Sequence, residues 1–499
     1  MGKYLKKFEN HNAYDAFTQT DGFIKPNVSY CTQENEVHYN PWTWAEEYLT
    51  TVALEDGTIS FNISQPMGTD MITSISYSTD GGETWITTDN VNDKEENLVI
   101  DVDVEEGDKV MWKGEATQTG YYDVDEDVVY GSFFSSDCEF DAQGNVMSLL
   151  YGDDFKGETT LEEHIFCFLF SDGDEVKNCN IVNANNLSLP AATLAEDCYG
   201  YMFYNCTSLV NTSELPATTL AEYCYNGMFV NCTSLTTAPQ LPATTLAQSC
   251  YGGMFQGCTS LTTAPDLPAT TLRNYCYQSM FNGCTSLVNA PQLPATTLAN
   301  WCYSNMFQGC TSLTTAPQLP ATTLAEYCYG GMFFSCTSLV NTPELPATTL
   351  VNQCYNGMFG GCTSLVNAPQ LPATALASYC YSNMFGGCTS LVNSPQLPAT
   401  TLISGCYANM FNGCSSLVTA PELSAATLVE NCYYYMFYGC ANLNYVKAMF
   451  TTTPGATYTN KWLQNVASSG TFVKNSAATW NVSGVNGIPT GWTVQTASA

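Results

Sequence analysis

The residues of this chain best suited to chemistry are its 24 cysteines, because a thiolate can attack a substrate, bind a metal ion or form a disulfide. Twenty of them fall in two registers that each repeat every 26 residues, starting at Cys198 and Cys206. The three histidines, His11, His38 and His164, are scattered, and no group of His, Cys and Glu has the spacing of zinc ligands. We therefore predict no catalytic residue, no metal site and no cofactor.

Disulfides are the other possibility for these cysteines. Within one repeat, Cys224 and Cys232 are eight residues apart, which on a helix separates them by about 12 Å, too far for a disulfide. Between neighbouring repeats the separation would be about 5 Å, which a disulfide tolerates. We favour free thiols that stack as small apolar side chains in a core. The start, Met1–Glu9, lacks the apolar stretch of a signal peptide, and so also predicts folding in a reducing cytoplasm.

Two acidic runs, Asp101–Glu106 and Tyr122–Asp127, could attract a hard cation such as Ca²⁺. They lack the EF-hand spacing, so we interpret them as solvated acidic loops. A third motif, Ser78–Trp85, has the S-x-D-x-G-x-T-W pattern of the Asp-box known from sialidases, where it is a structural hairpin turn. A sialidase also needs several such boxes and a cluster of arginines, whereas this chain has one arginine, Arg273. These motifs therefore give no reason to predict an enzyme.

Charge is distributed unevenly along the 499 residues. The formal net charge is −33, and 37 of the 46 acidic and 9 of the 13 basic residues lie within positions 1–180. Positions 181–440 hold nine acidic residues and one basic residue, so this block is nearly uncharged. A chain this negative repels phosphate backbones and anionic lipids, and no apolar run is long enough to span a membrane. We expect neither nucleic-acid binding nor membrane insertion.

The nearly uncharged block is a tandem repeat. The unit Cys224–Ala247 recurs about ten times between 198 and 440 in steps of 26 residues, without insertion or deletion, and such a period is typical of a solenoid. Cys224, Met228, Cys232 and Leu235 are spaced like one face of a short helix, which precedes an extended Thr-Thr-Ala-Pro-Gln-Leu segment. We predict an α/β leucine-rich-repeat solenoid in which each coil contributes a short helix and a short strand.

Changes in pattern divide the chain into four regions. Positions 1–50 predict a small mixed α/β attachment module, because a piece of this size holds too little core to be stable alone. Positions 51–140 alternate apolar and polar residues between regular turns, which is typical of an antiparallel β-sandwich. The solenoid, with a degenerate N-terminal cap, occupies 141–450. Trp462, Phe472, Trp480 and Trp492 recur in 451–499, which predicts a C-terminal β cap.

One position of the repeat varies more than the others. The residue before the first cysteine is, in order, Asp197, Tyr223, Ser249, Tyr275, Trp301, Tyr327, Gln353, Tyr379, Gly405 and Asn431. A position free of the stacking constraint faces solvent, and exposed aromatic rings can stack on sugars or anchor a protein. The candidate ligand-binding residues are therefore Tyr223, Tyr275, Trp301, Tyr327 and Tyr379. The alternative is that they are ordinary exposed loop residues.

The Met-Phe-x-x-Cys-Thr-Ser-Leu frame over about 165–450 resembles the BspA-like leucine-rich repeats of bacterial surface proteins and of virion proteins of gut bacteriophages. The resemblance implies a curved solenoid used for adhesion or ligand display, without catalysis. The opening Val28–Pro41 is similar to the front of structural proteins of phages that infect Bacteroides-type hosts, which implies attachment through Tyr30, His38, Tyr39 and Pro41. Two features depart from the family, since the repeat is longer than the common unit and a bacterial adhesin's export signal is missing.

These features support two main hypotheses. The first is a non-catalytic phage virion protein, a fibre or a capsid or tail decoration on the exterior of the particle. It would bind other virion proteins through 1–50, and a glycan or protein of the host surface or of mucus through the solenoid. The alternative is a BspA-like adhesin on the bacterial cell surface, and a third hypothesis is an intracellular scaffold that binds proteins through its strand face. Whether the chain forms a homo-oligomer stays open.

Overall fold

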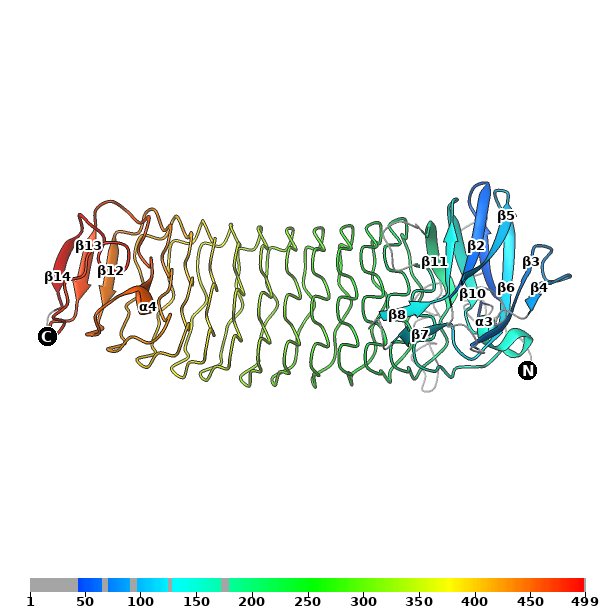
Figure 1. Ribbon diagram of the computed structural model, residues 1–499, viewed down its shortest axis with the longest axis horizontal. Helices are drawn as coiled ribbons and strands as arrows, with labels where there is room; N and C mark the ends of the chain where they lie inside the picture. The colour runs from blue at the N-terminus through cyan, green and yellow to red at the C-terminus, as the bar shows by residue number, and fades with distance from the viewer. Residues whose placement is uncertain (1–43, 65–70, 90–96, 124–127, 172–178, 498–499) are drawn as a thin grey trace, which may run out of the picture.

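The computed structural model describes residues 44–64, 71–89, 97–123, 128–171 and 179–497. They form an elongated molecule with a β-sheet domain at one end, a long stack of coils and a small sheet at the other end (Figure 1). The predicted module 1–50 lies almost wholly outside the described residues. Within the described ranges, no helix has the length and apolarity needed to cross a bilayer.

The N-terminal domain consists of two main sheets packed face to face. Its elements are β1 (Leu49–Ala53), β2 (Gly57–Ser64), β3 (Ile72–Ser78), β4 (Ile86–Asp89), β5 (Asn97–Val104), β6 (Lys109–Ala116), β7 (Gly120–Asp123), β8 (Val128–Gly131), β9 (Phe133–Ser136), β10 (Phe140–Asn145), α3 (Ser148–Tyr151), a 3-10 turn (Gly152–Asp154) and β11 (Ile181–Ser188). The larger sheet has the order β11-β10-β1-β6-β3-β4 and the smaller β5-β2-β9, while β7 and β8 form a separate pair. Phe61 and Phe134 of the smaller sheet pack on Trp112 of the larger one, with ring centroids 6.1 and 5.3 Å from that of Trp112.

Strands β2 to β6 lie within the alternating region 51–140 that predicts a β-sandwich. The Asp-box pattern forms the expected hairpin turn between β3 and β4, because the Asp80 carboxylate accepts hydrogen bonds from the Thr84 N–H and hydroxyl and from the Ser78 hydroxyl. These bonds lower the pKa of Asp80 to about 2. The sheets extend past both ends of 51–140, since β1 begins at Leu49 and β10 ends at Asn145.

The larger sheet leads directly into the solenoid through β11. This strand pairs in parallel with β10, and its Asn183 bridges in parallel to Asn211 of the next coil. The aromatic core is continuous as well, because the Phe170 ring stacks between Phe134 of β9 and Phe203 of the first regular coil, at 5.5 and 5.1 Å. The sandwich therefore covers the N-terminal end of the solenoid core.

Each coil is built around a turn segment, defined as the stretch from the variable position to the second cysteine, such as Tyr275–Cys284. Its N–H groups alternate between two kinds of partner. The Tyr277 N–H donates to the Cys302 carbonyl of the next coil at 3.1 Å, whereas the Gln278 N–H donates back to the Tyr275 carbonyl at 3.1 Å and closes a β-turn. This alternation continues through the segment, and a left-handed φ recurs at every fourth residue, beginning with the variable position.

The short helix predicted from the spacing of Cys224, Met228 and Cys232 is therefore wrong, and the repeats are not α/β. A left-handed residue in every four interrupts an α-helix, whose φ stays near −63°. The four-residue spacing arises because two overlapping turns advance the chain by four residues and return the side chain to the interior. The predicted buried stripe is confirmed, since these three side chains and Leu235 have no exposed surface.

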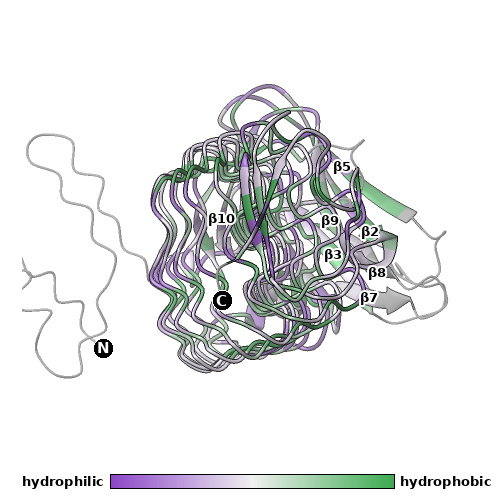
Figure 2. Cartoon of the chain, turned by 90° about the vertical axis from the view of Figure 1, so that its left-hand side faces the viewer, coloured by the Kyte–Doolittle hydropathy of each residue, from purple (hydrophilic) through white to green (hydrophobic). Residues whose placement is uncertain are grey.

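Two aromatic ladders run through the solenoid core. The tyrosine after the first cysteine of each coil stacks on its counterparts at centroid distances of 5.8–6.1 Å, from Tyr199 to Tyr433. The phenylalanine after the methionine stacks in the same way at 5.1–5.8 Å, from Phe170 to Phe437. In a view along the long axis of the solenoid, the coils lie behind one another with little offset (Figure 2). Each ring packs on copies of itself, which holds the coils in register.

The cysteines confirm the expectation of free thiols in a core. All 23 cysteines in the described part of the chain are free and buried. From Cys232 to Cys440, each second-register thiol donates to the carbonyl of the phenylalanine 29 residues earlier, as Cys232 does to Phe203 at 3.0 Å. Burial raises the pKa of the Cys232 thiol well above its ordinary value, so the donor stays protonated.

The C-terminal end consists of further, degenerate coils. Its elements are β12 (Tyr445–Ala448), α4 (Ala456–Thr459), β13 (Thr471–Lys474) and β14 (Thr493–Thr496). The three strands pair in parallel, and Tyr445 bridges to Thr419 of the last regular coil. The Trp462 ring stacks on Tyr433 at 6.2 Å, and its indole N–H donates to the Gly487 carbonyl at 2.9 Å. The tryptophans of this region thus replace the ladder residues where the regular frame ends.

Candidate ligand-binding face of the solenoid

The structure places the predicted ligand-binding residues in one column along the solenoid, at the first position of their turn segments. These residues are Tyr223, Tyr275, Trp301, Tyr327 and Tyr379. Each N–H donates to a carbonyl of the next coil at 3.0–3.2 Å, so the backbone of this aromatic column is fixed by the fold. Tyr223 and Tyr379 are 38% and 39% exposed, and the other three side chains are partly buried.

All five aromatic residues have left-handed backbone conformations, with φ between 53° and 60°. An L-residue with a bulky side chain avoids this region at a cost of about 1–2 kcal/mol, which Gly escapes and Asn partly escapes. The two other left-handed positions of the turn segment mostly follow that rule, because the regular coils have Gly or Asn there except for Tyr201, Ser279, Ser335 and Tyr435. The first position therefore accepts strain in five coils to hold a ring, which the fold itself does not require.

Three of the five rings come together and two stand apart. Tyr275 stacks on Trp301 with centroids 6.0 Å apart, and Trp301 stacks on Tyr327 at 4.0 Å. Burial within this stack raises the pKa of Tyr327. Tyr223 and Tyr379 continue the same column, each separated from the stack by one coil that has Ser249 or Gln353 at this position. The column thus consists of a three-ring ridge with a single tyrosine beyond each end.

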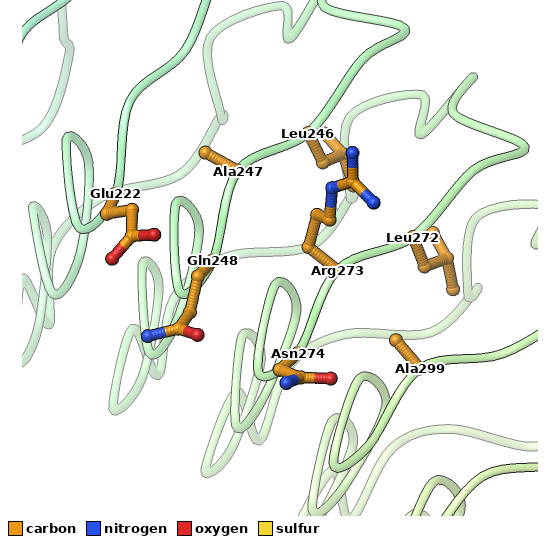
Figure 3. Close-up of a pocket in the computed structure, with 8 residues that line it drawn as sticks. All are labelled: Glu222, Leu246, Ala247, Gln248, Leu272, Arg273, Asn274 and Ala299. Atoms are coloured by element: carbon orange, nitrogen blue, oxygen red, sulfur yellow. The ribbon is translucent and has the colours of Figure 1, made fainter.

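A groove of about 460 Å³ lies across the segments that precede the variable position in neighbouring coils (Figure 3). Its lining residues are Glu222, Leu246, Ala247, Gln248, Leu272, Arg273, Asn274 and Ala299. In the sequence, Glu222, Gln248 and Asn274 directly precede the variable position of three successive coils, which Tyr223, Ser249 and Tyr275 occupy. Glu222, Gln248 and Asn274 form a row along one side, while the Arg273 side chain extends away from that row (Figure 3).

The repeating coils match one family model, described as a BspA type leucine-rich repeat region, over residues 177–287, 275–391 and 326–466. Together these matches cover more than half of the chain. The chain belongs to the BspA-type leucine-rich repeat family. Comparisons with curated proteins and with solved structures gave no match. Members of the BspA-type family are commonly adhesin-like surface proteins.

The groove residues were not predicted from the sequence, although one register of the BspA-type repeat contains a signal for Arg273. In the regular coils, the position after the core leucine holds a small or branched apolar residue with a single exception. The apolar residues are Ala195, Ala221, Ala247, Ala299, Ala325, Val351, Ala377, Ile403 and Val429. The exception is Arg273. Arg273 therefore stands out in the sequence as the one break in an apolar register.

The other predicted sites add no ligand cluster. The four residues predicted for attachment lie outside the described residues, namely Tyr30, His38, Tyr39 and Pro41. In the first acidic run, Asp101 and Asp103 accept hydrogen bonds from the hydroxyls of Ser60 and Thr58 across the β2–β5 pair. Most of the second run, Tyr122–Asp127, is not described. Within the described ranges no three His, Cys, Asp or Glu side chains are grouped as metal ligands would be.

One cluster at the start of this BspA-type solenoid combines a thiol, an imidazole and a carboxylate. The Cys167 thiol donates to the Asp197 carboxylate at 3.7 Å, and Nδ1 of His164 lies 3.3 Å from the same oxygen. A catalytic cysteine needs a lowered pKa and a base beside it. Here burial raises the pKa of the Cys167 thiol well above its ordinary value, and its partner is the carboxylate. The arrangement is therefore that of a buried structural cluster.

Proposed function

We propose that this protein is a non-catalytic display and adhesion protein whose solenoid binds a glycan or a protein on a host surface or in mucus. The observation that carries the proposal is the aromatic column, in which five rings occupy left-handed positions that favour glycine. Membership of the BspA-type family supports the same role. The stacked core supplies the stability, while the column supplies side chains that the core does not need.

For its location we propose the exterior of a phage virion, as a fibre or a capsid or tail decoration, with residues 1–50 bound to other virion proteins. The similarity of Val28–Pro41 to phage structural proteins supports this location. The family match favours a second candidate, an adhesin on the bacterial cell surface. Mass spectrometry of purified particles separates the two, because the protein must be present in virions under the first proposal and in the cell envelope fraction under the second.

Binding is tested with the full chain on host cells and on immobilised mucin. The double variant Tyr275→Gly, Trp301→Gly removes two rings of the ridge at positions whose backbone suits glycine. We expect the free energy of unfolding to change by no more than about 1 kcal/mol, because relieved strain offsets lost stacking. Binding should weaken at least about tenfold, the scale of one or two lost aromatic anchors.

The matched control for this test is Asn409→Gly, which makes the same kind of change in another left-handed column of a distant coil. It should leave binding unchanged. If the double variant binds as well as the wild type on both surfaces, the aromatic column is not the binding face and the proposal fails.

A further inference from the structure

Arg273 is placed unlike any other residue of the regular coils. It is the single basic residue between positions 181 and 440, and it replaces a small or branched apolar residue at its register. Its neighbours in the stack, Ala247 and Ala299, have short side chains, so the long Arg273 side chain rises above them beside the groove. Within the described part of the chain, its guanidinium forms no ion pair and no hydrogen bond.

An unpaired guanidinium at a groove is a binding group for an anion. Its planar fork donates two parallel hydrogen bonds to a carboxylate, and charge-assisted bonds of this kind are roughly twice as strong as neutral ones. The surrounding coils are nearly uncharged, so one anionic group can approach although the whole chain is strongly negative. Glu222 lies on the other side of the same groove, which favours a ligand with a single, local anionic group over a polyanion.

A row of amide side chains occupies the register between that of Arg273 and that of the variable position. We define this amide row as Gln248, Asn274 and Asn300, at one register of three successive coils. Oδ1 of Asn274 accepts the backbone N–H of Asn300 at 3.2 Å, and Oδ1 of Asn300 accepts that of Glu326 at 3.1 Å. These bonds fix both amide groups, and the Nδ2 donors have no partner among the described residues. The row therefore presents oriented donors to a ligand.

Aromatic rings, fixed amides and a carboxylate such as that of Glu222 are protein groups that bind sugars. Sugar hydroxyls need hydrogen-bond donors and acceptors, while sugar C–H faces pack on rings. We propose that the groove and the ridge bind a glycan containing a carboxylated sugar, whose carboxylate pairs with Arg273 while its hydroxyls bond to the amide row. Neighbouring sugars extend along the ridge, towards Trp301. This inference rests on the adhesion role proposed above and specifies its ligand.

The test uses the full chain and a panel of oligosaccharides that contain galacturonic, glucuronic or sialic acid, each paired with its carboxyl-reduced form. We expect at least one acidic oligosaccharide to bind at least about tenfold more tightly than its reduced form, the scale of one charge-assisted pair. Arg273→Ala should abolish that preference and leave binding of the reduced form unchanged. Alanine occupies this register in the adjacent coils, so the variant keeps the fold.

Two further variants separate charge from geometry and from the ridge. Arg273→Lys keeps the charge without the planar fork and should recover only part of the preference. Trp301→Gln, which copies the residue of another coil at this register, should weaken binding of both forms alike.

Two outcomes overturn the inference. Equal binding of every acidic oligosaccharide and its reduced form, or a preference that survives Arg273→Ala, removes Arg273 as the anion-binding group. The adhesion role would still stand if the chain binds host cells and the ridge variants lose that binding. Binding to cells that persists after periodate treatment of their glycans would identify a protein ligand and also reject the inference.

Discussion

Replacing Phe307 by alanine tests whether neighbouring coils stabilise one another through the aromatic ladder. The Phe307 ring has no exposed surface, and its centroid lies 5.6 and 5.7 Å from those of Phe281 and Phe333. Truncating a buried phenylalanine costs about 3–5 kcal/mol, and stacking on both sides places this ring near the upper end of that range. Phe307→Leu keeps most of the buried volume and should cost roughly 1–2 kcal/mol.

The damage should remain close to the altered coil. Each coil touches only its neighbours, so a lost contact weakens two interfaces and leaves distant ones intact. The Phe307 N–H donates to the Met332 carbonyl at 2.9 Å, and such bonds between coils protect amides from exchange. Hydrogen exchange in increasing urea should therefore show early loss of protection across 275–336 in Phe307→Ala. Peptides from β2 and β5 should retain theirs.

Two results would refute this reasoning. If β2 and β5 lose protection together with the altered coil, the molecule unfolds as one cooperative unit and its stability is not a sum over neighbouring coils. If the alanine variant costs less than about 1 kcal/mol, the packing of the Phe307 ring does not hold the coils together.

Three other changes have defined outcomes. The Tyr251 hydroxyl is buried without a hydrogen-bond partner in the described structure, so Tyr251→Phe should raise the free energy of unfolding in urea by about 1 kcal/mol, and a loss of that size would contradict this. The hydrogen bond with Asp197 raises the pKa of His164 above 6.5, so this pair stabilises the fold below pH 6.5 and stops doing so as pH rises through the folded-state pKa. His164→Gln should flatten the pH dependence of the thermal unfolding temperature. An unchanged pH dependence would exclude the His164–Asp197 pair as its source. The pKa of Asp80 is lowered from 3.8 to about 2. The stabilisation that this carboxylate gives the fold is therefore present above pH 3.8 and lost as pH falls towards 2. The loss should appear as an acid transition in the fluorescence of Trp85, which belongs to the same turn, and Asp80→Ala should remove that transition. A transition that persists in the variant would arise from other carboxylates.

The period, the buried stripe and the variable face could be predicted from the sequence because each depends on register alone. A repeat of 26 residues without insertion aligns every coil, so residues that must pack on their counterparts stay constant and those that face solvent vary. Leu235 and Met228 belong to the first class, and Trp301 to the second. The structure agrees for the first two, which have no exposed surface. The variable position is exposed only in some coils, since Tyr223 and Tyr379 are exposed, Trp301 is partly buried, and Asp197 and Ser249 are buried.

The backbone of the turn segment could not be predicted from apolar spacing. A step of four residues suits an α-helix and also suits overlapping β-turns, so Cys224, Met228 and Cys232 do not distinguish them. The distinguishing signal was in the other residues, because Gly227 and Asn231 stand where the φ is left-handed. Residues of this kind at fixed four-residue intervals disfavour a helix. Arg273 was missed for another reason, since its role depends on a groove that only the stacked coils create.

The division between core and face explains why binding groups gather in a few coils. Any coil can change its outer residues without disturbing its neighbours, because the ladders and the bonds between coils carry the stability. The coils from Tyr223 to Tyr327 use this freedom for rings, amides and Arg273. The coils after them lack a basic residue and expose a valine at one register, where Val340, Val366, Val392 and Val418 are each 41–49% exposed, as is Val288 in an earlier coil at 44%. If the ligand were recognised by the repeat itself, every coil would present the same groups. Because the groups differ along the rod, variants in the ridge should weaken binding, while Asn431→Gly, at the same register of the last regular coil, should not.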